Sequence, residues 1–256
     1  MKDTFKKIGW ALSYPFVIIA LLFNLWGIKR KAKKYRNNRQ ELFLADRLAA
    51  IYKLFKKVIY LKRIEVEVEG FENLPAKQML YIPNHKSSMD PLCLYIALYE
   101  SGKMGPTSFV VKNELTKKWY CKWALVLMDA IPLQRDNPRS MLECFNKQDE
   151  FVKRGDSIII YPEGTRVPGD TFNEFKPTTL KVAYDNFITI EPIAIYGADL
   201  KNHSTKKYKH VVYVSALKPI QPNNFITTNK EQLMSVIQHS VEDKYVELKI
   251  KASITK

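Results

Sequence analysis

The sequence has little of what disulfide-linked or metal-bound folds require. Its three cysteines, Cys93, Cys121 and Cys144, form no Cys-x-x-Cys pair. Three of the four histidines lie after position 200 and show no metal-ligand spacing with the cysteines: His203, His210 and His239. We therefore predict no disulfide framework and no metal site. The cysteines are expected to be small core residues in a reducing compartment, and the three histidines to be surface residues.

The chain also lacks internal repeats, low-complexity linkers and the Gly-x-Ser-x-Gly elbow that presents a nucleophilic serine in many hydrolases. Its hydrophobic content of 46% is normal for a globular core. A length of 256 residues suffices for one sizeable domain with an appendage.

Excess positive charge is absent from most of the chain, although the net charge is +15. Residues 1–28 contribute +2 and residues 29–63 contribute +11, which leaves +2 for residues 64–256. A nucleic-acid-binding protein more often spreads positive charge over its folded domain. We therefore expect no nucleic-acid partner, and we expect residues 1–63 to form a basic arm.

An uncharged run of 21 residues, Ile8–Ile28, lies within this arm. As a helix it would be roughly 31 Å long, which is enough to cross a bilayer. Pro15 and the basic residues on both sides fit a helix that stays in one leaflet equally well. If the helix spans, the larger basic cluster after it places that side at the cytoplasmic face of the cell membrane.

A second helical pattern occupies residues 35–60, where apolar residues recur at helical spacing between basic ones. It predicts a basic amphipathic helix lying on an anionic membrane surface. The alternative is a helix that packs its apolar side on the core and leaves its basic side in solvent. We favour the membrane because a membrane-length apolar run precedes this helix.

Residues 64–256 alternate short apolar runs with helical patterns. We expect strands at residues 64–69, 79–82, 109–111, 130–133, 157–161, 188–195 and 211–215. We expect helices at residues 91–100, 116–127, 138–154, 178–184 and 230–249. This alternation predicts an α/β domain over residues 64–256, with a mostly parallel central sheet flanked by helices.

The stretch 84–91 pairs His85 with Asp90, five residues on. On one helix these positions would point about 140° apart, so the side chains would not meet. They meet if His85 lies in a turn and Asp90 is the N-cap of a helix that starts at Pro91. A carboxylate-oriented imidazole can take a proton from an alcohol. The alternative is an ordinary capping aspartate beside a loop histidine.

A second polar stretch follows the buried run at residues 157–160 and contains Glu163, Gly164 and Arg166. Glycine lets the backbone approach a ligand closely, and arginine forms a fork for phosphate oxygens. Lys112 and Arg135 also follow expected strands, so a parallel sheet would bring all these cations to the His85 edge. The alternative is a turn with a surface Glu–Arg pair, which would contribute little.

These motifs resemble the glycerolipid acyltransferase superfamily, most closely the bacterial 1-acyl-glycerol-3-phosphate acyltransferases. The resemblance covers about residues 64–200 and rests on five blocks: Asn84 to Asp90, Lys112 to Leu115, Ile131 to Arg135, Pro162 to Arg166 and Glu191 to Ile195. Two positions depart from the usual pattern. Tyr161 replaces phenylalanine, and Asp129 replaces glycine.

The resemblance implies direct acyl transfer without an enzyme-bound intermediate. His85, oriented by Asp90, would deprotonate the hydroxyl of 1-acyl-glycerol-3-phosphate, giving phosphatidic acid. The acceptor phosphate would be held by Arg166 with Glu163, Gly164 and Thr165, helped by Lys112 and Arg135.

The implied partners are membrane lipids, lysophosphatidic acid, and acyl-CoA or acyl-carrier protein as donor, with no cofactor. Glycerol-3-phosphate or another lysophospholipid is the alternative acceptor. A non-catalytic membrane adaptor is the alternative from another class.

Overall fold

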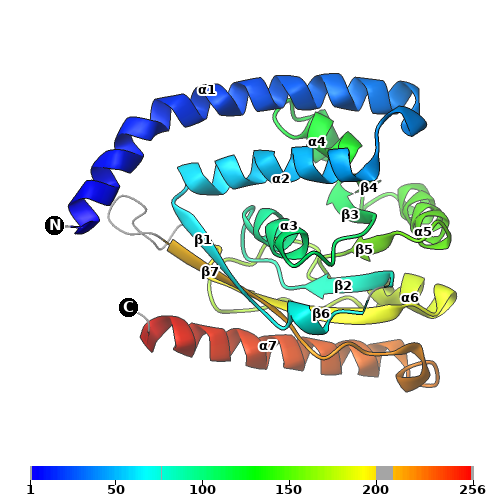
Figure 1. Ribbon diagram of the computed structural model, residues 1–256. Coiled ribbons are helices and arrows are strands. Elements are labelled where there is room, and N and C mark those ends of the chain that lie inside the picture. The colour runs from blue at the N-terminus through cyan, green and yellow to red at the C-terminus, as the bar shows by residue number, and fades with distance from the viewer. Residues whose placement is uncertain (1, 76, 200–209, 255–256) are drawn as a thin grey trace.

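The computed structural model places a seven-stranded sheet between two layers of helices (Figure 1) and describes residues 2–75, 77–199 and 210–254. The strands are β1 (Ile64–Glu69), β2 (Met79–Pro83), β3 (Thr107–Lys112), β4 (Ile131–Leu133), β5 (Ser157–Ile159), β6 (Thr189–Tyr196) and β7 (His210–Ala216). The α-helices are α1 (Lys2–Asn37), α2 (Leu44–Leu61), α3 (Asp90–Glu100), α4 (Lys122–Leu127), α5 (Pro138–Lys153), α6 (Lys181–Asn186) and α7 (Lys230–Ile254).

The strand order is β1-β7-β6-β2-β5-β3-β4. Every neighbouring pair is parallel except β6 and β7. The mostly parallel α/β sheet expected from the sequence is therefore confirmed. Because β2, β5, β3 and β4 are consecutive and parallel, their carboxyl ends meet at one edge of the sheet.

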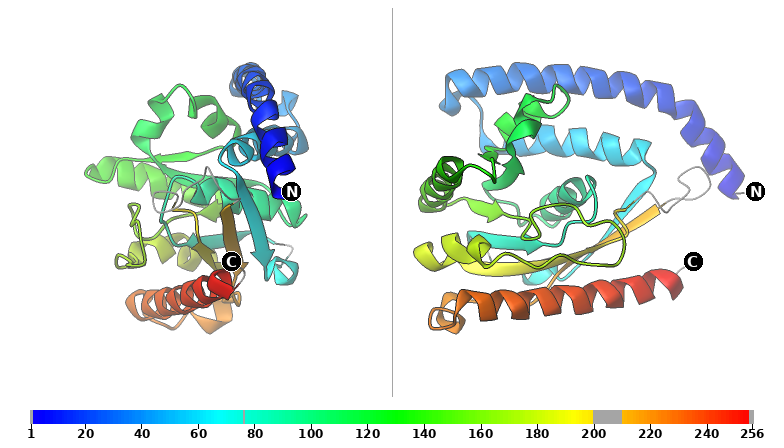
Figure 2. Two further views of the ribbon diagram at one scale, coloured as in Figure 1. Left: turned by 90° about the vertical axis from the view of Figure 1, so that its left-hand side faces the viewer. Right: turned by 180° about the vertical axis from the view of Figure 1, so that it is seen from behind.

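One face of the sheet is covered by α2, α3 and α4, with α1 packed outside α2 and α4, and the other face is covered by α5, α6 and α7. Each side has its own apolar core. Figure 2 shows these layers from two further directions. Most expected boundaries agree to within two residues. The main correction concerns the helix expected from residue 116, because Asn113–Lys117 forms the 3-10 helix η3 and α4 begins only at Lys122.

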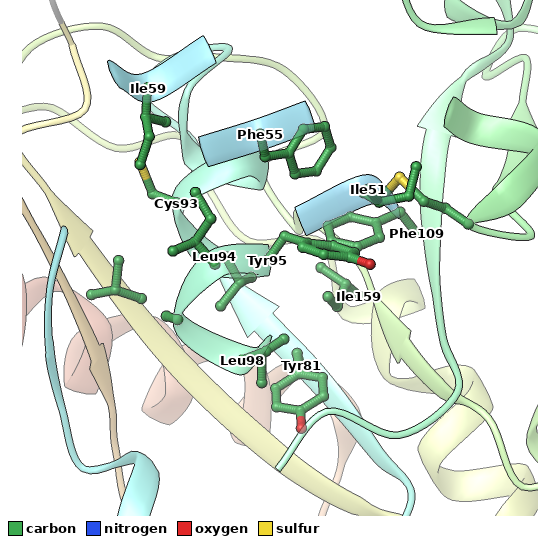
Figure 3. Close-up of a cluster of buried hydrophobic side chains, with 14 of the residues drawn as sticks. Ile51, Phe55, Ile59, Tyr81, Cys93, Leu94, Tyr95, Leu98, Phe109 and Ile159 are labelled. Carbon is green, nitrogen blue, oxygen red and sulfur yellow. The ribbon is translucent and has the colours of Figure 1, made fainter. Parts of the chain in front are cut away.

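The second helix of the arm differs from its prediction in start and in role. It begins at Leu44 rather than at residue 35, since α1 continues to Asn37 and the Asn38 side chain caps a short 3-10 turn. Its apolar side packs onto α3 in the core, with Ile51, Phe55 and Ile59 facing Tyr95 and Leu94 (Figure 3). The core-facing alternative was therefore right for α2, because its apolar side is buried against the apolar surface of α3. The division of the chain at residue 63 stays a prediction.

The first helix is longer than the expected 8–28 and carries two apolar sides. Ile28, Ala32 and Tyr35 are buried against the domain. The opposite side exposes a stripe of large apolar residues at helical spacing: Leu12, Phe16, Ile19, Leu22, Phe23 and Trp26. The segment Leu12–Asn37 is long and apolar enough to cross a membrane by length and composition alone, and only 6% of its most apolar window is buried. This helix can anchor the protein to a membrane.

Asp129, which departs from the family pattern, ties the arm to the domain. Its φ of +48° is the left-handed conformation that favours glycine. Its buried carboxylate accepts hydrogen bonds from Arg47 (2.8 Å, α2) and from the Tyr35 hydroxyl (2.7 Å, α1). Arg39 and Arg154 lie 3.5 and 3.6 Å away. One carboxylate thus joins α1, α2 and the end of α5.

The expectations for cysteines and histidines hold in part. Cys93 and Cys144 are buried core residues, but Cys121 is partly exposed at the start of α4. His239 is exposed and bonds the Ser235 carbonyl, whereas His210 is half-buried and bonds the Gly197 carbonyl. His203 lies outside the described residues.

Glu191 is a carboxylic acid within the core, in register with Tyr81 on β2. Neither carboxyl oxygen has a hydrogen bond of normal geometry to the described part of the chain. Burial raises the pKa of this carboxyl from 4.5 to about 8, against a smaller opposing effect of the Leu217 N–H. Between these values the folded protein binds a proton that the unfolded chain releases, so stability falls as pH rises through this window.

Replacing Glu191 with glutamine should therefore stabilise the protein at pH 7, by roughly 1–2 kcal/mol once the buried amide is allowed for. The free energy of urea unfolding should also lose most of its decline between pH 5 and pH 8. An exposed acid on β1, Glu67, gives the control variant Glu67→Gln, which should leave that decline in place. An unchanged decline in Glu191→Gln would contradict the assignment.

Candidate active site

The loop after β2 is fixed before it reaches His85. Asn84 is fully buried, and its side chain bonds both backbone groups of Ile195 on β6, donating to the carbonyl (3.0 Å) and accepting from the N–H (2.7 Å). The loop therefore leaves the sheet in one direction, and His85 follows at the carboxyl edge.

Asp90 holds the imidazole as expected but does not act as an N-cap. It is the first residue of α3, after Met89, and its carboxylate turns back toward the loop. Its Oδ2 lies 2.8 Å from His85 Nδ1 and accepts the N–H groups of Lys86 (2.7 Å) and Ser87 (2.8 Å). Three donors of the loop therefore bind one oxygen of this carboxylate and fix its position.

The second ring nitrogen of His85 is left to act as a base. A carboxylate only accepts hydrogen bonds, so Nδ1 carries the proton toward Asp90, and Nε2 keeps a free lone pair. The side chain is 18% exposed, and its ring lies 4.2 Å from the ring of Tyr161. The Tyr161 hydroxyl is buried without a hydrogen bond in the described part of the chain. Phenylalanine, usual at this position, would make the same ring contact.

Glu163 joins the His85 loop to the loop after β5. It is buried, and burial raises the pKa of its carboxyl. One oxygen accepts the His85 N–H (2.6 Å) and the other the Asn173 N–H (3.2 Å). The His85 carbonyl in turn accepts the Val167 N–H at 2.9 Å. Glu163 therefore acts on the backbone and sets the spacing between the two loops.

Lys86 is a buried cation next to His85 that the sequence did not single out. Its ammonium donates to the Thr171 carbonyl and lies 3.4 Å from the ring centroid of Phe172. Burial lowers its pKa, and the charges of Glu163 and Asp90 oppose this effect. Lys86 therefore pins residues 171–172 over the His85 loop. No spacing pattern in the sequence identifies it.

A cavity of about 470 Å³ opens beside Glu163. The residues lining it are Arg135, Glu163, Gly164, Thr165, Asn173, Glu174, Lys176 and Pro177. Gly164 has a φ of +72°, and a Cβ there would lie 3.5 Å from the guanidinium carbon of Arg135 and from Cε of Lys176. Two cations therefore flank the glycine turn. This volume is within the usual range of small-ligand sites.

The structure brings some predicted site residues together and not others. The cavity is lined by four of them: Arg135, Glu163, Gly164 and Thr165. Of these, Glu163 also accepts the backbone N–H of His85. Arg166 and Lys112 are exposed at the same edge and are not among the cavity-lining residues, and Lys112 pairs with Glu114 at 3.4 Å.

The sequence analysis missed Lys176. It lies in a polar loop beyond the Pro162–Arg166 motif, where no periodic or spacing signal marks it.

The arrangement is suited to an alcohol that carries an anionic group. A carboxylate-held imidazole can act as a base. The cavity also holds Glu163 and Glu174, and its Arg135 and Lys176 side chains can bind an anionic group. Cys93 offers no alternative nucleophile, because it is fully buried and burial raises the pKa of its thiol.

Comparison with known proteins gives the family. Residues 65–196 match the family model Acyltransferase. A probable 1-acyl-sn-glycerol-3-phosphate acyltransferase of Mycoplasma pneumoniae is 29% identical over 94% of this chain and 92% of its own length. A protein of the same name from Mycoplasma genitalium is 30% identical over 91% of this chain and 90% of its own length.

A solved structure gives the same fold. It is the 1-acyl-sn-glycerophosphate acyltransferase PlsC of Thermotoga maritima, which matches 96% of this chain and 98% of its own with a TM-score of 0.72 at 23% identity. The resemblance inferred from the motifs is confirmed. The chain belongs to the Acyltransferase family.

Proposed function

We propose that this protein transfers a fatty acyl group from an acyl thioester to the free hydroxyl of 1-acyl-glycerol-3-phosphate, giving phosphatidic acid. One observation carries the proposal: the His85–Asp90 pair is joined through Glu163 to a cavity flanked by Arg135 and Lys176. The names of both mycoplasma relatives support the same acceptor.

In the proposed step, His85 Nε2 takes the hydroxyl proton while the hydroxyl oxygen attacks the thioester carbonyl carbon. The new C–O ester bond forms, the C–S bond breaks, and the departing thiolate takes the proton from the imidazolium. Asp90 stabilises the imidazolium through Nδ1. The balance of atoms needs no cofactor and no acyl-enzyme.

The acceptor phosphate binds in the cavity between Arg135 and Lys176 in this proposal. Thr165 lines the cavity and can add a hydroxyl donor. Arg166 and Lys112, exposed at the same edge, are proposed to contact the substrate outside the cavity.

Replacing Arg135 with alanine should raise the Michaelis constant for the acceptor by about tenfold or more, with a smaller change in kcat. Initial rates over a range of lysophosphatidic acid concentrations measure this. Arg139→Ala is a matched control, since that arginine is exposed on α5 and pairs only with Glu143 among the described residues. If Arg166→Ala raises the constant more than Arg135→Ala does, the phosphate lies outside the cavity.

The acceptor is decided by a panel assay on the purified protein. One labelled acyl thioester is offered with lysophosphatidic acid, glycerol-3-phosphate and lysophosphatidylcholine. We expect phosphatidic acid as the main labelled product. Faster labelling of glycerol-3-phosphate, or of the zwitterionic lysolipid, would contradict the proposed acceptor. Acyl-CoA and acyl-carrier protein are tested in parallel as donors.

We propose that α1 lies in the plane of one membrane leaflet at the cytoplasmic face. It runs along α2 (Figure 1). The Ser13 hydroxyl lies 2.7 Å from the Tyr60 hydroxyl near one end, and Tyr35 bonds to Asp129 near the other. A helix packed lengthwise on the domain cannot cross a bilayer unless basic α2 enters with it, which would be costly. The exposed stripe on α1 faces away from the domain and suits the lipid.

A further inference from the structure

The segment between β3 and α4 exposes aromatic side chains well away from the α1 stripe in sequence. Trp119 is 73% exposed and Tyr120 52% exposed. Their rings stand edge to face, with centroids 5.9 Å apart. Leu115, on η3, is also exposed. An exposed tryptophan and tyrosine side by side form an apolar patch that a surface in contact only with water rarely keeps.

The same segment is cationic. Lys117, Lys118 and Lys122 are exposed around the aromatic pair. The only acidic residue between positions 112 and 127 is Glu114, and it pairs with Lys112. Exposed aromatic rings with a rim of unopposed lysines are the composition that binds an anionic bilayer interface, where the rings lie at headgroup depth and the ammonium groups meet lipid phosphates.

The patch lies beside the helix that the lipid would already hold. Helix α4 packs on α1, and the Arg36 guanidinium of α1 lies 5.6 Å from the ring centroid of Trp123. Both views of Figure 2 show the β3–α4 segment next to α1, on the side of the sheet opposite α7. The segment therefore lies beside α1, the helix that carries the exposed apolar stripe.

We propose that residues 115–122, here called the Trp119 loop, form a second membrane-docking element. Trp119 and Tyr120 enter the interface of an anionic bilayer next to α1, and Lys117, Lys118 and Lys122 bind its headgroups. The loop begins three residues after the end of β3, so this docking also turns the carboxyl edge of the sheet, which carries His85, toward the lipid. The inference concerns membrane contact and does not depend on the proposed acyl transfer.

A single-tryptophan reporter tests the insertion in the full chain. Trp10, Trp26 and Trp123 are replaced by phenylalanine, which leaves Trp119 as the only tryptophan. Vesicles of phosphatidylcholine with phosphatidylglycerol should shift its emission to the blue, and brominated phospholipids should quench it. The matched control adds Trp119→Phe and Val246→Trp to this background, which places the reporter on an exposed position of α7. The control emission should not change.

Vesicle affinity gives a second, independent measurement. Trp119→Ala with Tyr120→Ala should weaken sedimentation with anionic vesicles by about fivefold to tenfold, while Val236→Ala on α7 should not. Lys117→Glu with Lys118→Glu should weaken binding to anionic vesicles more than to pure phosphatidylcholine.

Unshifted Trp119 emission on membrane-bound protein would overturn the proposal. So would equal affinities of the Trp119→Ala/Tyr120→Ala variant and the unaltered protein for anionic vesicles. So would emission that shifts with an acidic acyl-carrier protein and not with vesicles, because the loop would then be a protein-docking surface.

Discussion

Replacing His85 with alanine is expected to lower kcat for acyl transfer by roughly 10²–10⁴-fold, the contribution of a positioned general base. Asp90 Oδ2 lies 2.8 Å from Nδ1 of this imidazole. Alanine removes the proposed base and leaves the cavity intact, because His85 is not one of the residues that line it. Because the cavity binds the acceptor before the proton moves, its Michaelis constant should change little. Steady-state rates of phosphatidic acid formation measure both constants.

The controls separate chemistry from folding and from membrane binding. His239→Ala removes an exposed histidine on α7 and should keep full activity. The His85→Ala protein should also sediment with anionic vesicles as the unaltered protein does. If it kept more than about a tenth of the activity, another group would be the base. If the unaltered protein bound vesicles but showed no turnover with any acceptor or donor, the adaptor alternative would be favoured.

Replacing Asp129 with alanine is expected to destabilise the protein by about 3–5 kcal/mol, the cost of leaving a buried partner charge unpaired. Asp129 is 6% and Arg47 12% exposed at the side chain, so this pair is shielded from water. Arg39 and Arg154 are 56% and 38% exposed, and their ion pairs with Asp129 contribute much less. Urea unfolding followed by circular dichroism gives the change in free energy.

Two further variants identify the cause of the loss. Asp129→Gly restores the residue common in the family and relieves the φ of +48°, yet it still removes the carboxylate. It should therefore recover only part of the loss, about 1 kcal/mol. Asp185→Ala, which breaks an exposed pair with Lys181, should stay within about 0.5 kcal/mol of the unaltered protein. A loss below 1 kcal/mol in Asp129→Ala would show that this carboxylate does not hold the arm.

Local sequence signals were reliable where one segment alone decides the outcome. The alternation of apolar runs with helical patterns predicted the parallel sheet, because strand and helix periods are properties of neighbouring residues. The His85–Asp90 spacing predicted a loop–helix pair, because only a turn brings these positions together. The predicted N-cap role of Asp90 was wrong, because its carboxylate binds three donors of the preceding loop instead.

Predictions that depend on a distant partner were less reliable. The amphipathic pattern of α2 is compatible with lipid or with a protein core, and only α3, packed against it, decides. Arg166 stood within the stronger motif and Arg135 in the weaker one, yet the fold turns Arg135 to the cavity and leaves Arg166 exposed. Lys176 and Lys86 had no sequence signal, because their roles come from loops that the sheet edge brings together.

The sequence by itself determined the α/β class, the family, the pairing of His85 with Asp90, and the apolar N-terminal helix. The tertiary structure decided which cations share the cavity, which side of α2 is buried, and how Asp129 holds the arm. The physical reason is range: periodicity and motif spacing act within one segment, whereas burial, ion pairing and cavity shape depend on contacts between segments far apart in the chain.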